Sequence, residues 1–168
     1  MEDTDRRADF TAYVRARQQH LARLAFLLTG NRDTADDLLQ NVLAKVYRHW
    51  GRIASVEQPE AYVRRIMVNE NNSRWRRFAR RPETPASHVI EVVEAPTPAG
   101  MDRGEAIDLW NQVQSLPRQQ RAVVVLRFYE DLSEVQTAEI LGCSVGTVKS
   151  HTSRALGALR TRMSEATA

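Results

Sequence analysis

The chain has 168 residues, of which 42% are hydrophobic and 27% charged, and its formal net charge is +3 at pH 7. This length accommodates one domain or two small ones with modest cores. No apolar run is long enough to span a membrane, so no membrane insertion is expected, and the charged segment from Met1 to Asp9 does not resemble a secretory signal. The single cysteine, Cys143, cannot form an internal disulfide, which suits a reducing, cytoplasmic environment.

The charge is distributed unevenly along the chain. Residues 1–81 carry 16 Lys/Arg and 10 Asp/Glu, residues 82–105 carry 1 and 5, and residues 106–168 carry 7 and 6. The pattern predicts two structured ends that are separated by an acidic middle segment.

Two amphipathic helices are predicted in the first part of the chain. Apolar residues recur at intervals of three and four from about Arg7 to Thr29, and Gly30 is expected to end this helix. Asn31 or Asp33 can cap the next helix, whose apolar stripe runs from Leu38 to Trp50. Polar side chains are expected at the exposed front of this second helix: Asp36, Asp37, Gln40 and Asn41. Asp36 and Asp37 either complement the helix dipole or bind a partner, and both interpretations stay open.

A third helix is predicted to start at Pro59, after a loop from Gly51 to Gln58. Its first half is apolar and includes Tyr62, whereas its second half is polar and ends in W-R-R-F-A-R-R. Cations suit phosphates and aromatic rings suit bases, so this end predicts a nucleic-acid surface, with a merely solvated face as the alternative. Five arginines fall around its aromatic residues: Arg74, Arg76, Arg77, Arg80 and Arg81.

The segment from Pro82 to Arg103 is rich in proline and acidic residues and should lack regular helix. It is either an inert tether or an acidic strand that lies in a basic channel of a partner. Helical pattern resumes near Arg103, and Pro117 starts a further helix. Residues Val123 to Leu126 of that helix are apolar almost all round, which indicates a central, buried position.

The stretch from Ser133 to Leu159 carries the most specific pattern and predicts a helix-turn-helix. Ser133 and Gln136 have the spacing of a capping box, Gly142 can take the left-handed conformation that ends a helix, and Ser144 is a second N-cap. The apolar positions expected to face inward are Val135, Ala138, Ile140 and Leu141 in the first helix, and Val145, Val148, Ala155, Leu156 and Leu159 in the second.

The second of these helices presents small, polar and cationic side chains outside its apolar stripe. Such a face can approach DNA closely, with hydroxyls and cations meeting phosphates and base edges. An ordinary helical hairpin with a solvated face is the alternative. The outward residues are Gly146, Thr147, Lys149, Ser150, Thr152, Ser153 and Arg154.

These motifs resemble those of bacterial group IV, or extracytoplasmic-function (ECF), sigma factors. Three segments of the chain resemble parts of these proteins. Region 4 is similar to the segment L-P-x-x-x-R-x-V-V-x-L-R-F-Y-E-D-L-S, which is followed by T-A-E-I-L-G-C-S-V-G-T-V-K-S. The region 2 helix that docks on RNA polymerase is similar to D-D-L-L-Q-N-V-L-A-K-V-Y-R-H-W, and the promoter-reading helix is similar to P-E-A-Y-V-R-R-I-M-V-N followed by W-R-R. The resemblance covers nearly the whole chain and is of the SigE-like type.

The resemblance implies an all-α fold of two small helical domains. Region 2 would occupy residues 1–81, an extended acidic linker residues 82–103, and region 4 residues 104–168. The linker would pass through the RNA exit channel of the polymerase.

The resemblance also assigns site residues. The loop from Arg52 to Gln58 would hold a flipped base of the downstream (−10) element, and Asn69 would read the opened strand. The clamp helices of the polymerase β′ subunit would be contacted by Asp37, Gln40 and Asn41. Phosphates near the downstream element would be held by Arg65, Arg74, Arg76 and Arg77. The upstream (−35) element would be contacted by Thr147, Lys149, Ser150, Ser153 and Arg154, with backbone contacts from Arg118 and Arg121.

The expected function is that of a promoter-specificity subunit. It would bind core RNA polymerase through the β′ clamp helices and the β flap, and would bind promoter DNA, while catalysis would belong to the polymerase. An anti-sigma factor is a common partner in this family, although no residue identifies one. Neither a cofactor nor a metal site is expected, because the four histidines lack a second ligand at metal spacing: His20, His49, His88 and His151.

Two other functions remain as alternatives. The segment G-T-V-K-S-H-T-S-R-A-L also resembles the helix-turn-helix of LuxR-type regulators, which would require a sensor or receiver domain in front of it. A helical enzyme or RNA-processing protein could use the arginine-rich helix, but it would need a cluster of catalytic groups that the sequence does not offer.

Overall fold

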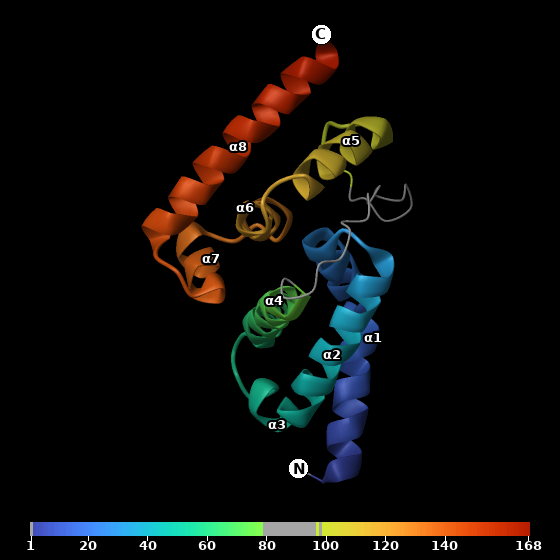
Figure 1. The fold of residues 1–168 in the computed structure, drawn as a ribbon. Helices are drawn as coiled ribbons and strands as arrows, with labels where there is room; N and C mark the ends of the chain where they lie inside the picture. Colours follow the sequence, from blue (N-terminus) through green and yellow to red (C-terminus); the bar gives the residue numbers. More distant parts are fainter. Residues whose placement is uncertain (1, 79–96, 98) are drawn as a thin grey trace. The chain divides into compact units, whose positions relative to one another are not determined.

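The computed structural model describes residues 2–78, 97 and 99–168. Every regular element among these residues is a helix, and the chain divides into two compact units, Met1–Thr84 and Pro85–Ala168 (Figure 1). The predicted all-α fold with two small helical domains is therefore confirmed. Most of the predicted acidic linker, residues 82–103, lies outside the described residues.

The first unit contains four helices within residues 2–78: α1 (Asp3–Thr29), α2 (Arg32–Arg48), α3 (Trp50–Ile53) and α4 (Pro59–Phe78). α1 begins earlier than predicted, with Asp3 and Asp5 in its first turn, where acidic side chains complement the helix dipole. The prediction that Gly30 ends it is confirmed: Gly30 has φ 74° and donates its N–H to the Phe26 carbonyl.

The core of the first unit lies where α2 packs against both α1 and α4. Asn31 starts α2 by accepting a hydrogen bond from the Thr34 N–H at 2.9 Å, so the chain reverses between α1 and α2 and the two helices lie side by side (Figure 1). The largest fully buried side chains are Leu21, Leu24 and Leu27 of α1, Leu38, Val42 and Val46 of α2, and Val63 and Met67 of α4.

The predicted loop from Gly51 to Gln58 is only partly correct. Trp50–Ile53 forms the short helix α3, because Trp50 and Ile53 are both buried in the core. The segment from Ala54 to Gln58 remains non-helical. Tyr62 was predicted among the apolar residues of α4, yet it is 46% exposed.

The second unit contains, within residues 99–168, α5 (Arg103–Gln114), α6 (Arg118–Val124), the π-helical turn η1 (Val125–Tyr129), α7 (Glu134–Leu141) and α8 (Val145–Thr167). The central helix is buried as predicted, since Val123, Val125 and Leu126 are fully buried. Its π-helical end was not predicted. The Glu130 N–H donates to the Val125 carbonyl at 3.0 Å, which inserts one residue into the turn.

The helix-turn-helix is confirmed by α7 and α8. Ser133 and Gln136 form the capping box, Gly142 has φ 67°, and the Ser144 hydroxyl accepts the Thr147 N–H at 3.1 Å. Ala138 packs in a small core with Val123 and Val148, against which Cys143 also lies. The inward placement of Val135 was wrong, because this side chain is 55% exposed. No helix in the described part of the chain is both long and apolar enough to cross a membrane.

Candidate nucleic-acid interface

The front of α2 presents an exposed polar face. Asp37, Gln40 and Asn41 all have exposed side chains, as does Asp36. Asp37 is also an ion-pair partner, because one of its carboxylate oxygens lies 3.7 Å from an Nη atom of Arg74 on α4. This face therefore offers carboxylate and amide groups to a partner, and one carboxylate also connects α2 with α4.

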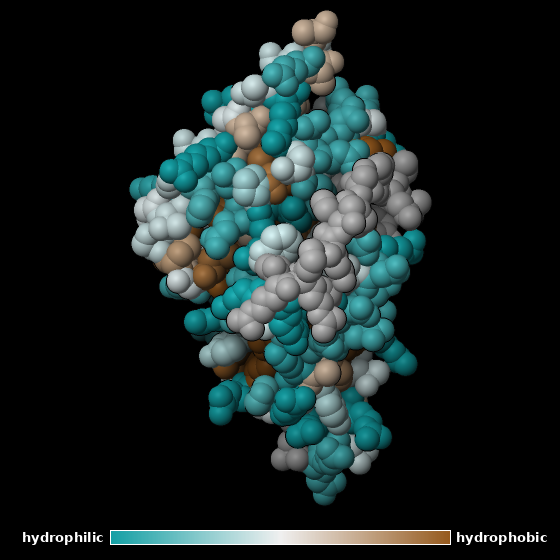
Figure 2. Space-filling model, viewed as in Figure 1, coloured by the Kyte–Doolittle hydropathy of each residue, from teal (hydrophilic) through white to brown (hydrophobic). Residues whose placement is uncertain are grey.

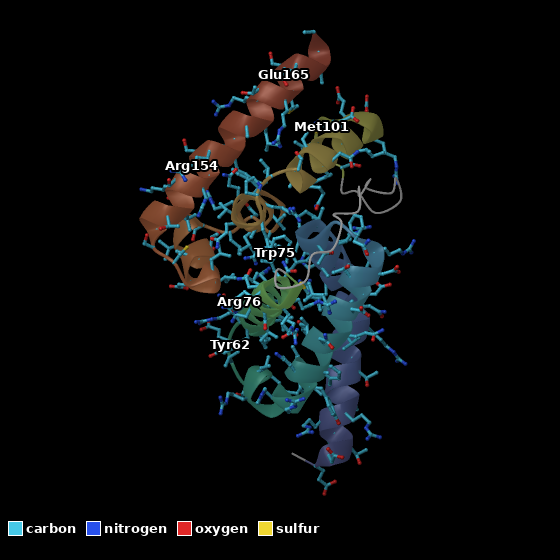
Figure 3. The ribbon with its side chains drawn as sticks, viewed as in Figure 1. Tyr62, Trp75, Arg76, Met101, Arg154 and Glu165 are labelled. Atoms are coloured by element: carbon cyan, nitrogen blue, oxygen red, sulfur yellow. The ribbon has the colours of Figure 1, made fainter. Side chains whose placement is uncertain are left out.

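One side of α4 aligns several of the predicted DNA contacts. Arg65, Asn69 and Arg76 are exposed and follow each other at spacings of four and seven, which places them within about 40° on the helix surface. Tyr62 lies one turn before Arg65 and extends the same side. Figure 3 views α4 nearly along its axis and shows Tyr62 and Arg76 on one side, with Trp75 on another.

The remaining arginines of α4 lie in different surroundings. The side chain of Arg74 is only 12% exposed and lies against α2 beside Asp37. Arg77 is exposed, and its guanidinium is 3.7 Å from Glu70. Glu70 is itself buried and is also bound by Lys45 of α2, so an ionic cluster lies between α2 and α4.

Arg52 is exposed at the start of the predicted base-holding loop. Its carbonyl accepts a hydrogen bond from the Ser55 hydroxyl at 2.8 Å, which closes the first turn after α3. Beyond this turn the side chains of Glu57 and Gln58 are exposed. The loop thus presents an open surface beside the beginning of α4.

The predicted contact face of α8 is open. Lys149, Ser150, Ser153 and Arg154 are exposed, and Arg154 projects outward from α8 in Figure 3. Lys149 lies 3.9 Å from Glu134 of α7, so this cation is partly neutralised. Thr147 is half-buried, and its hydroxyl lies 2.9 Å from that of Ser144, where it takes part in the helix cap.

The two arginines predicted to add backbone contacts are less open than those of α8. Arg121 donates two hydrogen bonds through one Nη atom, to the carbonyls of Gln114 at 3.0 Å and Leu116 at 3.3 Å. It therefore closes the C-terminal end of α5. Burial, and then the charge of Arg118, lower the pKa of Arg121. Arg118 is half-buried.

The face of the molecule seen in Figure 2 is mostly hydrophilic, with apolar residues gathered in small patches. The large apolar side chains that are exposed in the described residues include Tyr62, Trp75, Phe128, Val135 and Met163. No group of three or more His, Cys, Asp or Glu side chains within these residues could hold a metal ion.

Two family models match the chain. "Sigma-70 region 2" matches residues 6–81, and "Sigma-70, region 4" matches residues 106–159.

Similar proteins carry sigma-factor names. An RNA polymerase sigma-E factor of Streptomyces avermitilis is 39% identical over 153 residues, which cover 90% of this chain and 83% of that protein. The ECF RNA polymerase sigma factor SigM of Mycobacterium tuberculosis is 32% identical over 146 residues, covering 87% and 72% of the two chains. The structure of the sigma factor RpoE in complex with the anti-sigma factor NepR from Bartonella quintana matches with a TM-score of 0.75 and 25% identity, covering 93% of this chain and 97% of that one.

The fold and its two matched regions define a transcription initiation factor, and the chain belongs to the sigma-70 family. Within this family it is an ECF sigma factor of the sigma-E-like type, which binds core RNA polymerase and directs initiation at specific promoters.

Proposed function

We propose that the first unit binds core polymerase and reads the downstream promoter element, while the second unit reads the upstream element. The domain boundaries proposed are 1–81 and 104–168, with 82–103 as the connecting segment. The observation that carries the proposal is the alignment of Arg65, Asn69 and Arg76 on one exposed side of α4, together with the open face of α8.

The polymerase contact is assigned to the exposed front of α2. Asp37, Gln40 and Asn41 would meet the β′ clamp helices, and the second unit would dock on the β flap. Because Asp37 lies beside Arg74, the same carboxylate that faces the polymerase also steadies the start of the arginine run.

Promoter reading is assigned to three surfaces. The loop that begins at Arg52 would hold a flipped base, and Asn69 would contact the opened strand. Phosphates would be bound by the exposed Arg65, Arg76 and Arg77 on α4, with Arg74 acting from a more buried position. The upstream element would be read from α8 by Thr147, Lys149, Ser150, Ser153 and Arg154, with Arg118 and Arg121 at the edge of the same unit.

The chain is proposed to have no catalytic chemistry of its own, because nucleotide addition belongs to the polymerase. We place its action in the cytoplasm, where core polymerase and promoter DNA are found. A regulatory anti-sigma partner is also proposed, and it is supported by the Bartonella quintana relative, which was solved in complex with one.

The experiment is run-off transcription by core RNA polymerase on a genomic promoter pool, with and without this chain, followed by sequencing of the RNA starts. New starts that share two spaced upstream elements are expected. A variant of this chain that carries both Asp37→Arg and Gln40→Ala should bind core polymerase weakly and give fewer of these starts. If core gains no new starts while the chain alone binds duplex DNA tightly, the LuxR-type alternative is favoured and the roles of Asp37, Gln40 and Asn69 are rejected.

A further inference from the structure

We propose that Asp9, Tyr13 and Arg17 of α1 are positioning residues that fix both ends of the loop Ala54–Gln58. The inference rests on the proposed function of that loop as the site of a flipped promoter base. None of the three residues is expected to touch DNA. They act on the loop through Trp50 before it and Glu60 after it.

The entrance of the loop is fixed through Trp50, the first residue of α3. Its indole Nε1 donates a hydrogen bond to a carboxylate oxygen of Asp9 at 2.9 Å. The rings of Tyr13 and Phe10 pack against it, with centroids 4.9 Å and 5.5 Å from the indole. Trp50 is only 3% exposed, so its position is determined by α1 on one side and by the core on the other.

The exit of the loop is fixed through Glu60, the second residue of α4. Arg17 Nη2 donates a hydrogen bond to one carboxylate oxygen of Glu60 at 3.0 Å, and Arg17 Nε lies 2.9 Å from the other oxygen as an ion-pair contact. A charge-assisted hydrogen bond of this kind is stronger than one between neutral groups. Both side chains are partly buried, and Glu60 also lies in the first turn of α4, where the helix dipole favours a carboxylate.

Tyr13 lies between the two anchors. It packs on Trp50, and its pKa is raised first by burial and then by the nearby Glu60 carboxylate. The phenol is neutral near pH 7 with or without this shift, so Tyr13 packs on Trp50 without adding a charge beside the Glu60 carboxylate.

The spacing on α1 explains how one helix serves both ends. Asp9, Tyr13 and Arg17 follow each other at intervals of four, so they lie along one side of α1. Asp9 and Arg17 are separated by about 12 Å of helix axis. The entrance of the loop also has local hydrogen bonds: the Ala54 N–H donates to the Trp50 carbonyl at 2.8 Å, and the Ser55 hydroxyl donates to the Arg52 carbonyl at 2.8 Å. Beyond this turn the Val56 N–H reaches the Ile53 carbonyl at 3.3 Å. The contacts from α1 therefore add anchors outside the loop, at Trp50 before it and at Glu60 after it.

Rigid ends matter because a flipped base must be received by groups that are already in place. Binding to a preorganised surface avoids the cost of ordering it, and specificity is lost when the supporting residues are removed. Discrimination between a correct and a wrong base corresponds to about 5–150-fold in affinity. Loosening the loop should reduce this ratio while leaving contacts made elsewhere on α4 unchanged.

The test uses holoenzyme assembled from core polymerase and the full chain. Its affinity is measured for single-stranded downstream-element oligonucleotides that carry each of the four bases at each position. Arg17→Ala should lower the preference at the loop-held position to the low end of that range, about fivefold or less. The matched control is Arg15→Ala, which removes an exposed arginine of the same helix and should change the preference less than about twofold.

Conservative variants separate positioning from a general loss of stability. Asp9→Ala removes the acceptor for Trp50, whereas Asp9→Asn keeps an oxygen there and should restore the preference. A cycle of Arg17→Ala, Glu60→Gln and the double variant should be non-additive, because each single change breaks the same pair. Core affinity and thermal unfolding are measured for every variant.

The proposal is overturned if Arg17→Ala and Asp9→Ala retain the base preference, or if they lower it equally at all positions. A different result is expected if the proposed function itself is wrong and the loop holds no base. Substitutions of Ser55 and Val56 in the loop would then leave the base preference of the holoenzyme unchanged.

Discussion

Arg74 and Arg76 belong to the same run of arginines but have different surroundings. Arg74 is largely buried beside Asp37 of α2, whereas Arg76 is exposed on the side of α4 that carries Arg65 and Asn69. A largely buried guanidinium contributes packing and an ion pair in addition to the proposed phosphate contact, whereas an exposed one acts mainly on phosphate. The two positions therefore separate structural from electrostatic contributions.

The first prediction compares these two arginines. Arg76→Ala should reduce the salt dependence of holoenzyme binding to promoter DNA, lowering the slope of log K against log salt by about 1. Arg74→Ala should destabilise the first unit by about 1–2 kcal/mol, since it removes packing and an ion pair. Binding titrations over a salt series and hydrogen exchange of α2 and α4 measure the two effects. Equal behaviour of the two variants would contradict this distinction.

The second prediction concerns the face of α8. Lys149→Ala and Arg154→Ala should each weaken promoter binding and reduce transcription from promoters with the upstream element, because each removes an exposed cation. Affinity for core polymerase should remain unchanged, as measured by fluorescence titration. Arg160→Ala, an exposed position later on the same helix, serves as the control. Loss of core binding in the α8 variants would count against a DNA role.

At the scale of single elements, the turn between α7 and α8 depends on Gly142. Its φ of 67° lies in the left-handed region, and a Cβ there would meet no atom within 4 Å. The cost of a substitution is thus a backbone cost rather than a clash.

The third prediction follows from this turn. Gly142→Ala should destabilise α7 and α8 by about 1–2 kcal/mol because of the left-handed backbone. Gly157→Ala, in the interior of α8 with equally open space, should instead stabilise by about 0.5–1 kcal/mol. Hydrogen exchange of the α7 and α8 amides reports both changes. If the two variants shift stability in the same direction, the backbone explanation is wrong.

Helix ends were predictable because their chemistry is local. The roles of Gly30, Ser133, Gly142 and Ser144 depend on residues within four positions along the chain. The π-helical turn η1 was not predictable, since its register is decided by how the central helix packs against other helices.

The solvent exposure of side chains along the helices was less predictable than the positions at which the helices end. Hydrophobic periodicity placed Val135 inside and treated Tyr62 as part of an apolar half, and both are exposed. The outward face of α8 could be identified as the complement of a clear apolar stripe. The buried positions of Arg74 and Glu70, and the closing of α5 by Arg121, depend on neighbouring helices and carry no local signal.

At the scale of the whole molecule, the proposed promoter contacts lie on two separate compact units. Two weak sites on one chain gain affinity together only when their spacing is fixed, because the second binding event then becomes intramolecular. Core polymerase is the scaffold that would supply this spacing.

The fourth prediction is that the free chain binds promoter DNA weakly, whereas the holoenzyme binds it about 10²–10⁴-fold more tightly. Gel-shift titrations with the chain alone, core alone and the assembled holoenzyme provide the comparison. Tight and sequence-specific binding by the chain without polymerase would show that a scaffold is not needed.

The division into two units also has a consequence for how the protein is made. The first unit is built from helices that are consecutive in the chain, and α1 already packs against α2 across a short turn. Domains with such local contacts fold in about microseconds to milliseconds. Ribosomes add about 5–20 residues per second, so synthesis of the second unit takes several seconds. The face of α2 that we propose to bind polymerase is therefore expected to be folded on the ribosome before the helix-turn-helix has been synthesised.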